Sequence, residues 1–278
     1  MTAPANSPAR SSGRYAADQR VTQLGVVRSE LTKLRSLRST VLSLLAAAVF
    51  VVGLSALVPL VVVSHWPPSN PREAAGFDPT AVSLSGVFLA QLALGVLGVL
   101  VITGEYATGS IRSTFAAVPN RLPVLWAKTV VFAGVTLLVT VPAVLIAFFL
   151  GQFILSGKGI QASFGDAGVA RAVGGAALYL TVVGVLGIGL GALLRSTAAG
   201  ISALFGLLFV LPIIVRFLPT SVSSAVDKYL PNSAGQAITT VRVDPAALSP
   251  WTGFALFCLY AAVTIGAAAA VMLRRRDA

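Results

Sequence analysis

The chain has 278 residues, of which 56% are hydrophobic and only 10% are charged. Its mean hydropathy of +0.88 excludes an ordinary soluble globular domain and indicates an integral membrane protein. The formal net charge is +11, and whether this favours nucleic acid or a membrane topology depends on where the basic residues lie.

The N-terminal part of the chain divides into a tail and a predicted helix. Residues 1–19 are rich in Ser, Ala, Pro and Arg without periodicity, which predicts a disordered tail. Between residues 21 and 38, apolar side chains recur at helical spacing, at Leu24, Val27, Leu31 and Leu34. This pattern predicts an amphipathic helix on the inner membrane surface, with a charged flank that only sets topology as the alternative. Its candidate site residues are Glu30, Lys33, Arg35 and Arg38.

Six apolar windows between charged residues are long enough for spanning helices, which need about 20 residues each. Trimmed at Pro, Gly and polar residues, the predicted spans are 40–63, 81–103, 124–150, 171–194, 198–218 and 251–273. Residues 20–278 are therefore predicted to form one all-α transmembrane domain whose two termini lie on the same side.

The basic residues are divided unequally between the two sides that six crossings define. Those on the terminal side are Arg10, Arg14, Arg20, Arg28, Lys33, Arg35, Arg38, Arg112, Arg121, Lys128, Arg195, Arg274, Arg275 and Arg276. Those on the opposite side are Arg72, Lys158, Arg171, Arg216, Lys228 and Arg242. Because positively charged loops are retained in the cytoplasm, both termini are expected there. The charge then reflects topology, so membrane lipid rather than nucleic acid is the expected partner.

Residues 104–121 form a polar and basic island between the second and third spans. One apolar stripe at helical spacing runs through it, made of Ile111, Phe115 and Val118. A short helix with one such stripe suits docking into the groove of a partner protein. Glu105 opens the island, and the sequence leaves two roles open for it. It is either a surface carboxylate paired with Arg112 or Arg121, or a part of the contact with the partner.

Two later regions carry weaker signals. The fourth span contains Gly187 and Gly191 at G-x-x-x-G spacing, which permits a close helix approach. The segment 219–249 is the longest on the side opposite the termini, and its pattern predicts one short helix between Pro219 and Pro231 and another near 233–240.

Patterns typical of enzymes and metal sites are missing from the sequence. The single histidine, His65, has no further ligand at metal-binding spacing, so a structural role at the membrane border is expected and no metal site. Cys258 is the only cysteine and is expected to pack inside the sixth span. No G-x-x-x-x-G-K-[ST] loop occurs, so any ATP hydrolysis would need another subunit. The predicted spans carry no charge near their middle, which disfavours an ion-coupled carrier and an intramembrane enzyme.

Residues 102–121, ITGEYATGSIRSTFAAVPNR, resemble the segment after the second span in permease subunits of type 2 ABC transporters, where E-Y-x-x-G-[ST]-[IL]-R recurs. Residues 29–40, SELTKLRSLRST, resemble the interfacial helix of actinobacterial-type members, and residues 229–238, YLPNSAGQAI, are similar to their outer segment before the last span. In that family the segment after the second span is a cytoplasmic coupling helix that contacts the ATPase. The resemblance implies coupling contacts for Glu105, Tyr106, Gly109, Ser110, Ile111, Arg112 and Phe115, and the apolar stripe adds Val118.

The resemblance implies a transport subunit in a bacterial plasma membrane and not an enzyme. Two identical copies, or one copy with a homologous partner, would bind a dimeric cytoplasmic ATPase. That ATPase would hold ATP and Mg, and this chain would bind no cofactor. Export of a hydrophobic or amphiphilic compound is expected, because the spans offer only scattered polar groups. The alternative is an ATP-independent secondary carrier or a membrane scaffold.

Overall fold

The computed structural model describes residues 23–36, 38–70, 73, 76–109, 121–242 and 244–274, and these residues form helices and no strand. Six helical stretches are long and apolar enough to cross a membrane. They are α2 (Arg38–Ser64), α5 (Val87–Ala107), α7 (Arg121–Ser156), α8 (Val169–Leu194), the continuous series α9, η1 and α10 (Thr197–Arg216) and α13 (Pro250–Arg274). The prediction of an all-α, multi-pass membrane protein is thus confirmed. The predicted tail at 1–19 lies outside the described residues.

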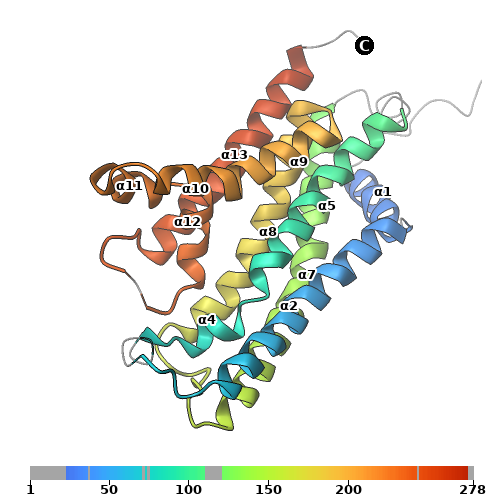
Figure 1. Ribbon diagram of the computed structural model, residues 1–278. Coiled ribbons are helices and arrows are strands. Elements are labelled where there is room, and N and C mark those ends of the chain that lie inside the picture. Colours follow the sequence, from blue (N-terminus) through green and yellow to red (C-terminus); the bar gives the residue numbers. More distant parts are fainter. Residues whose placement is uncertain are drawn as a thin grey trace, which may run out of the picture.

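The helix α8 lies at the centre of the bundle, in contact with α5, α7 and α13 (Figure 1). On the opposite side of α5 and α7 from α13, α2 packs against both. A helix, α1 (Gln23–Ser36), occupies the N-terminal segment for which an interfacial helix is predicted, and it packs against the start of α7 with Leu34 buried. We call the end of the bundle that carries α1 the α1 end, and the C-terminal end of α13 lies there too (Figure 1).

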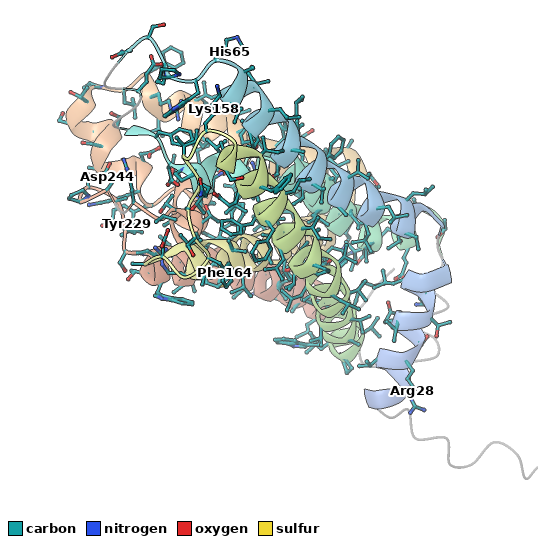
Figure 2. All side chains as sticks on the ribbon, turned by 90° about the horizontal axis from the view of Figure 1, so that it is seen from below. Arg28, His65, Lys158, Phe164, Tyr229 and Asp244 are labelled. Carbon is teal, nitrogen blue, oxygen red and sulfur yellow. The ribbon has the colours of Figure 1, made fainter. Side chains whose placement is uncertain are left out.

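The helix α2 runs from one end of the molecule to the other. Its 27 residues correspond to about 40 Å at the helical rise of 1.5 Å per residue. Figure 2 shows Arg28 of α1 near one end of this helix, and His65 and Lys158 near its other end. His65 is exposed there, with Nδ1 at 2.9 Å from the carbonyl oxygen of Val61.

Glycines on several faces of α8 let neighbouring helices approach closely. A Cβ atom on Gly187 would overlap the carbonyl oxygen of Gly95 in α5, and one on Gly191 would lie 3.0 Å from the carbonyl oxygen of Val99. The G-x-x-x-G pair therefore faces α5, as its spacing allows. Gly189 lies against Thr264 of α13 in the same way.

The second span begins later than predicted. Instead of one helix from residue 81, the structure has a short helix α4 (Pro79–Ser83), capped by the Asp78 carboxylate, and then α5 from Val87. The break lies against α2, where Gly86 donates its N–H to the hydroxyl of Ser55 at 3.2 Å. A Cβ on Gly86 would overlap backbone atoms of α2, so the chain turns here because the two backbones touch.

The longest helix, α7, has 36 residues and is anchored at both ends by polar side chains. Near its C-terminal end, the amide of Gln152 donates to the carbonyl oxygen of Pro79 and to the hydroxyl of Ser83, both at 3.0 Å. The side-chain carbonyl oxygen of Gln152 accepts a hydrogen bond from the backbone N–H of Ala162 at 2.7 Å. The helix continues through Pro142.

The segment after the fifth span forms the two short helices that its pattern predicts. These are α11 (Thr220–Asp227), which buries none of its residues, and α12 (Pro231–Gln236), which continues into the 3-10 turn η2 (Ala237–Thr239). In Figure 1, α10 and α11 run at a steep angle to α8 and α13, on the side away from α1 and α2. The α12 helix packs against α13 and the π-helical stretch η1.

Candidate coupling site at the end of α5

The predicted coupling residues fall partly within the described structure. Glu105 and Tyr106 lie in the last turn of α5, and Gly109 follows the helix with a φ of +70°. This left-handed conformation suits glycine and ends the helix. The remaining predicted residues, Ser110, Ile111, Arg112, Phe115 and Val118, lie outside the described residues.

Four charged side chains from three helices meet at the α1 end of the bundle, and we call them the charge cluster. They are Glu30 and Lys33 of α1, Glu105 of α5 and Lys128 of α7. The ammonium of Lys128 lies 2.7 Å from Oε2 of Glu30 and 2.9 Å from Oε1 of Glu105. Lys33 contacts the same two carboxylates, at 2.8 Å from Oε1 of Glu30 and 3.3 Å from Oε1 of Glu105. Two acids and two bases thus form a closed, neutral ring of ion pairs.

The cluster is largely withdrawn from solvent, which makes its pairing structurally important. The exposed fraction is 2% for Glu30 and 3% for Lys128, whereas the Lys33 side chain remains 36% exposed. Isolated charges at such depth would be costly, so each must be neutralised by a partner. Within the described residues, Oε2 of Glu105 is buried and accepts no hydrogen bond. One oxygen of this carboxylate therefore serves both lysines.

The surroundings of Glu30 and Lys33, the two residues of the charge cluster that lie on α1, shift their pKa values in favour of the ionised forms. Burial alone would raise the pKa of Glu30, but the charges and hydrogen bonds of Lys128 and Lys33 outweigh it and hold the pKa below its ordinary value. Desolvation would likewise lower the pKa of Lys33, but the two carboxylates outweigh it and raise the pKa above its ordinary value. Both groups therefore stay charged across the neutral range.

The other side of the same α5 turn is held by the corner between α8 and α9. The hydroxyl of Thr197 donates to the hydroxyl of the buried Thr103 at 2.9 Å. The guanidinium of Arg195 lies 5.6 Å from the ring centre of Tyr106, within the range of a cation–π contact. The end of α5 is therefore bound to α1 and α7 on one side and to the α8–α9 corner on the other.

The predicted partners of Glu105, Arg112 and Arg121, have side chains outside the described part of the chain. Within that part, the Glu105 carboxylate pairs with Lys33 and Lys128. Its side chain is 15% exposed, so this carboxylate balances basic neighbours in a partly buried position, and a contact with a partner protein stays a prediction. For the predicted α1 residues, Glu30 and Lys33 join the cluster, whereas the side chains of Arg35 and Arg38 lie outside the described residues.

Sequence reasoning missed Lys128, which was assigned only to the positive side of the topology. A signal was present, because Lys128 lies one helical turn from two apolar residues that are also buried, Val124 and Phe132. A basic residue on the inward face of an apolar helix requires an acidic partner, and Glu30 and Glu105 are the acids nearest to the predicted inner border. The contacts of Thr103 with Thr197 and of Tyr106 with Arg195 gave no comparable signal.

No group of three His, Cys, Asp or Glu side chains that could hold a metal ion occurs among the described residues. In the described part of the chain, the charge cluster sets two acids against two bases and so fixes the positions of α1, α5 and α7 relative to one another. No protein-family model matches the sequence, and the search of curated proteins gives no match.

Proposed function

We propose that this chain is the transmembrane permease subunit of an ATP-driven transporter of the type 2 ABC class. It would work with a second permease copy, identical or homologous, and with a separate cytoplasmic ATPase. The observation that carries the proposal is the way the last turn of α5 is held. Glu105 and Tyr106 lie a few residues before the segment 110–120 and contact α1, α7 and the α8–α9 corner. A force applied to residues 110–120 would therefore be transmitted to these three places together.

Several features of the sequence support the same reading. The chain lacks a P-loop of its own, so an ATP-driven protein of this kind needs a partner ATPase. The excess of basic residues on the terminal side supports a cytoplasmic position for the α1 end in a bacterial cell, where such an ATPase would bind. The apolar stripe of Ile111, Phe115 and Val118 supplies a face for a groove. The scattered polar groups of the spans suit a hydrophobic or amphiphilic compound, which we propose is exported.

The test is co-purification of the tagged chain with a P-loop ATPase, for which a reading frame next to that of this chain is the first candidate to be sought. The two proteins are co-expressed, extracted in mild detergent and separated by size exclusion. The ATPase should elute with the parent chain, and Ile111→Asp or Phe115→Asp should abolish the association, because a carboxylate cannot enter an apolar groove without a partner. Ser113→Asp adds the same charge on the opposite side of the same short segment and should leave the association intact.

A folding control separates loss of docking from loss of structure. The two Asp variants should elute as monodisperse protein with the parent's unfolding midpoint, since the charge cluster is unchanged in them. Association that survives both Asp substitutions would overturn the docking face. A chain that never binds the ATPase and transports without ATP would instead establish the ATP-independent carrier.

A further inference from the structure

A chain of polar side chains crosses the interior of the bundle between α5, α8 and α12. Gln91 of α5 and Tyr179 of α8 are both fully buried, and the Tyr179 hydroxyl contacts the amide oxygen of Gln91. The same hydroxyl lies 3.1 Å from Oδ1 of Asn232, which also accepts from Nε2 of Gln236 at 2.8 Å. Tyr179 is thus the only member that joins the core of the bundle to α12.

The donors and acceptors in this row of polar side chains cannot all be paired. The Tyr179 hydroxyl has one hydrogen but faces two amide oxygens, those of Gln91 and Asn232. Within the described residues, Nε2 of Gln91 is buried and has no partner. Turning the Gln91 amide over lets its nitrogen donate to the Tyr179 oxygen and frees the tyrosine proton for Asn232, but Oε1 of Gln91 is then unpaired. Either way one buried amide atom stays unpaired, which weakens this arrangement relative to one that satisfies it.

Glycines allow α12 to lie tightly against its neighbours. A Cβ on Gly235 of α12 would lie 2.6 Å from the Tyr179 ring and 2.9 Å from the ring of Phe257 in α13. A Cβ on Gly253 of α13 would lie 2.6 Å from the carbonyl oxygen of Ala234. The helix α12 is only six residues long. It is held by the polar link at Tyr179, by these close contacts and through η2, where Arg171 donates to the carbonyl oxygens of Ile238 and Thr240.

The segments that border α12 differ in how firmly they are held. Before it, α11 buries no residue. After it, η2 is held firmly, because Ile238 is fully buried and its carbonyl oxygen accepts a hydrogen bond from Arg171 at 3.2 Å. Residues 244–248, beyond η2, are exposed or partly exposed turns. On a third side lies η1, five π-helical residues from Gly206 to Val210, and π-helical insertions in α-helices frequently mark functional sites. A short stretch such as α12 with η2, closely fitted but bordered by exposed segments, can leave its site as a unit.

We propose that α12 is a movable gate segment and that Tyr179 is the latch that holds it against the bundle through Asn232. Gln91 lies on the same helix as Glu105, 14 residues away, which corresponds to about 21 Å along α5. Under the proposed transport function, α5 therefore connects the charge cluster to the latch. The latch itself does not depend on that function, because it concerns only how α12 is held in this chain.

The test is hydrogen exchange of the full chain in lipid nanodiscs, followed by mass spectrometry. Tyr179→Phe keeps the ring against Gly235 and Phe257 and removes only the hydroxyl. Backbone amides of residues 231–239 should exchange about 5-fold faster than in the parent, as expected for the loss of one buried hydrogen bond. Thr181→Val removes another buried hydroxyl of α8, which bonds the Ala177 carbonyl within the same helix, and should leave residues 231–239 at the parent rate.

A second substitution distinguishes a latch from general loosening. Asn232→Ala favours the helical state of α12 by propensity but removes the acceptor, so it should also accelerate exchange in residues 231–239. The double variant Tyr179→Phe/Asn232→Ala should be no faster than the faster single variant, because both remove the same bond. Parent-like exchange in Tyr179→Phe, or equal acceleration along the whole bundle, would overturn the proposal. Neither result bears on ATPase binding, so failure here is separable from failure of the proposed function.

Discussion

Substitution of Lys128 by Met tests whether the charge cluster holds the α1 end together. Met preserves an unbranched side chain and removes the ammonium that lies 2.7 Å from Glu30 and 2.9 Å from Glu105. Among the described residues, Lys33 is then the base left to the two carboxylates, and its side chain is 36% exposed. Removing one partner of a buried ion pair costs about 3 to 5 kcal/mol. For a chain of this size that corresponds to a decrease of roughly 10 °C in the unfolding midpoint.

The assay is thermal unfolding of the detergent-solubilised protein, followed by tryptophan fluorescence and by the monodisperse peak in size exclusion. Lys158→Met is the matched control, because Lys158 is exposed and lies at the other end of the molecule (Figure 2). Its midpoint should stay near that of the parent. The double variant Glu30→Gln/Lys128→Met removes one charge of each sign and should be less destabilised than the two single effects together, by about 2 kcal/mol. A stable Lys128→Met, or strictly additive single effects, would refute the closed ring of ion pairs.

Two further predictions concern pH and helix packing. Glu30 has a lowered pKa in the folded chain, so its stabilising contribution is present above the ordinary value of 4.5 and is lost as the pH falls through the lowered pKa. Lys33 has a raised pKa, so its contribution is present below 10.5 and is lost as the pH rises through the raised pKa. Unfolding midpoints measured from pH 3 to 8 should therefore fall at the acidic end, and less steeply in Glu30→Gln; parallel curves would contradict this assignment. On α5, Gly98→Ala would overlap the carbonyl oxygen of Gly184, whereas Gly104→Ala meets no atom within 4 Å. The first should destabilise the protein by about 1 to 3 kcal/mol and the second should be neutral or stabilising, so equal midpoints would argue against the close α5–α8 contact.

The spans were predictable because a helix in lipid must satisfy its own backbone, which requires long apolar windows between charges. The break before α5 was not, since its cause is contact between Gly86 and the backbone of α2. The position of Glu105 at the start of the polar island marks it as a candidate site residue, but the sequence does not indicate which residues it pairs with. Lys33 and Lys128 lie 72 and 23 residues away in the chain, and only the packing of α1 and α7 brings them together. The hydrogen-bonded side chains that meet at Tyr179 could not be predicted for the same reason.

The distance between the two polar anchors of α7 can be compared with the thickness of a lipid bilayer. Lys128 and Gln152 are both buried and bonded to neighbouring helices, and the 24 residues between their positions correspond to about 36 Å of helix. A hydrocarbon layer is about 30 Å thick, so α7 fits with its anchors at the two borders when moderately tilted. A thinner membrane would increase the tilt or leave one anchor outside the hydrocarbon layer, and a thicker one would draw an anchor into lipid. Through the contacts of Lys128 with Glu105 in α5 and of Gln152 with Ser83 in α4, a change in the tilt of α7 would be passed to both of these helices.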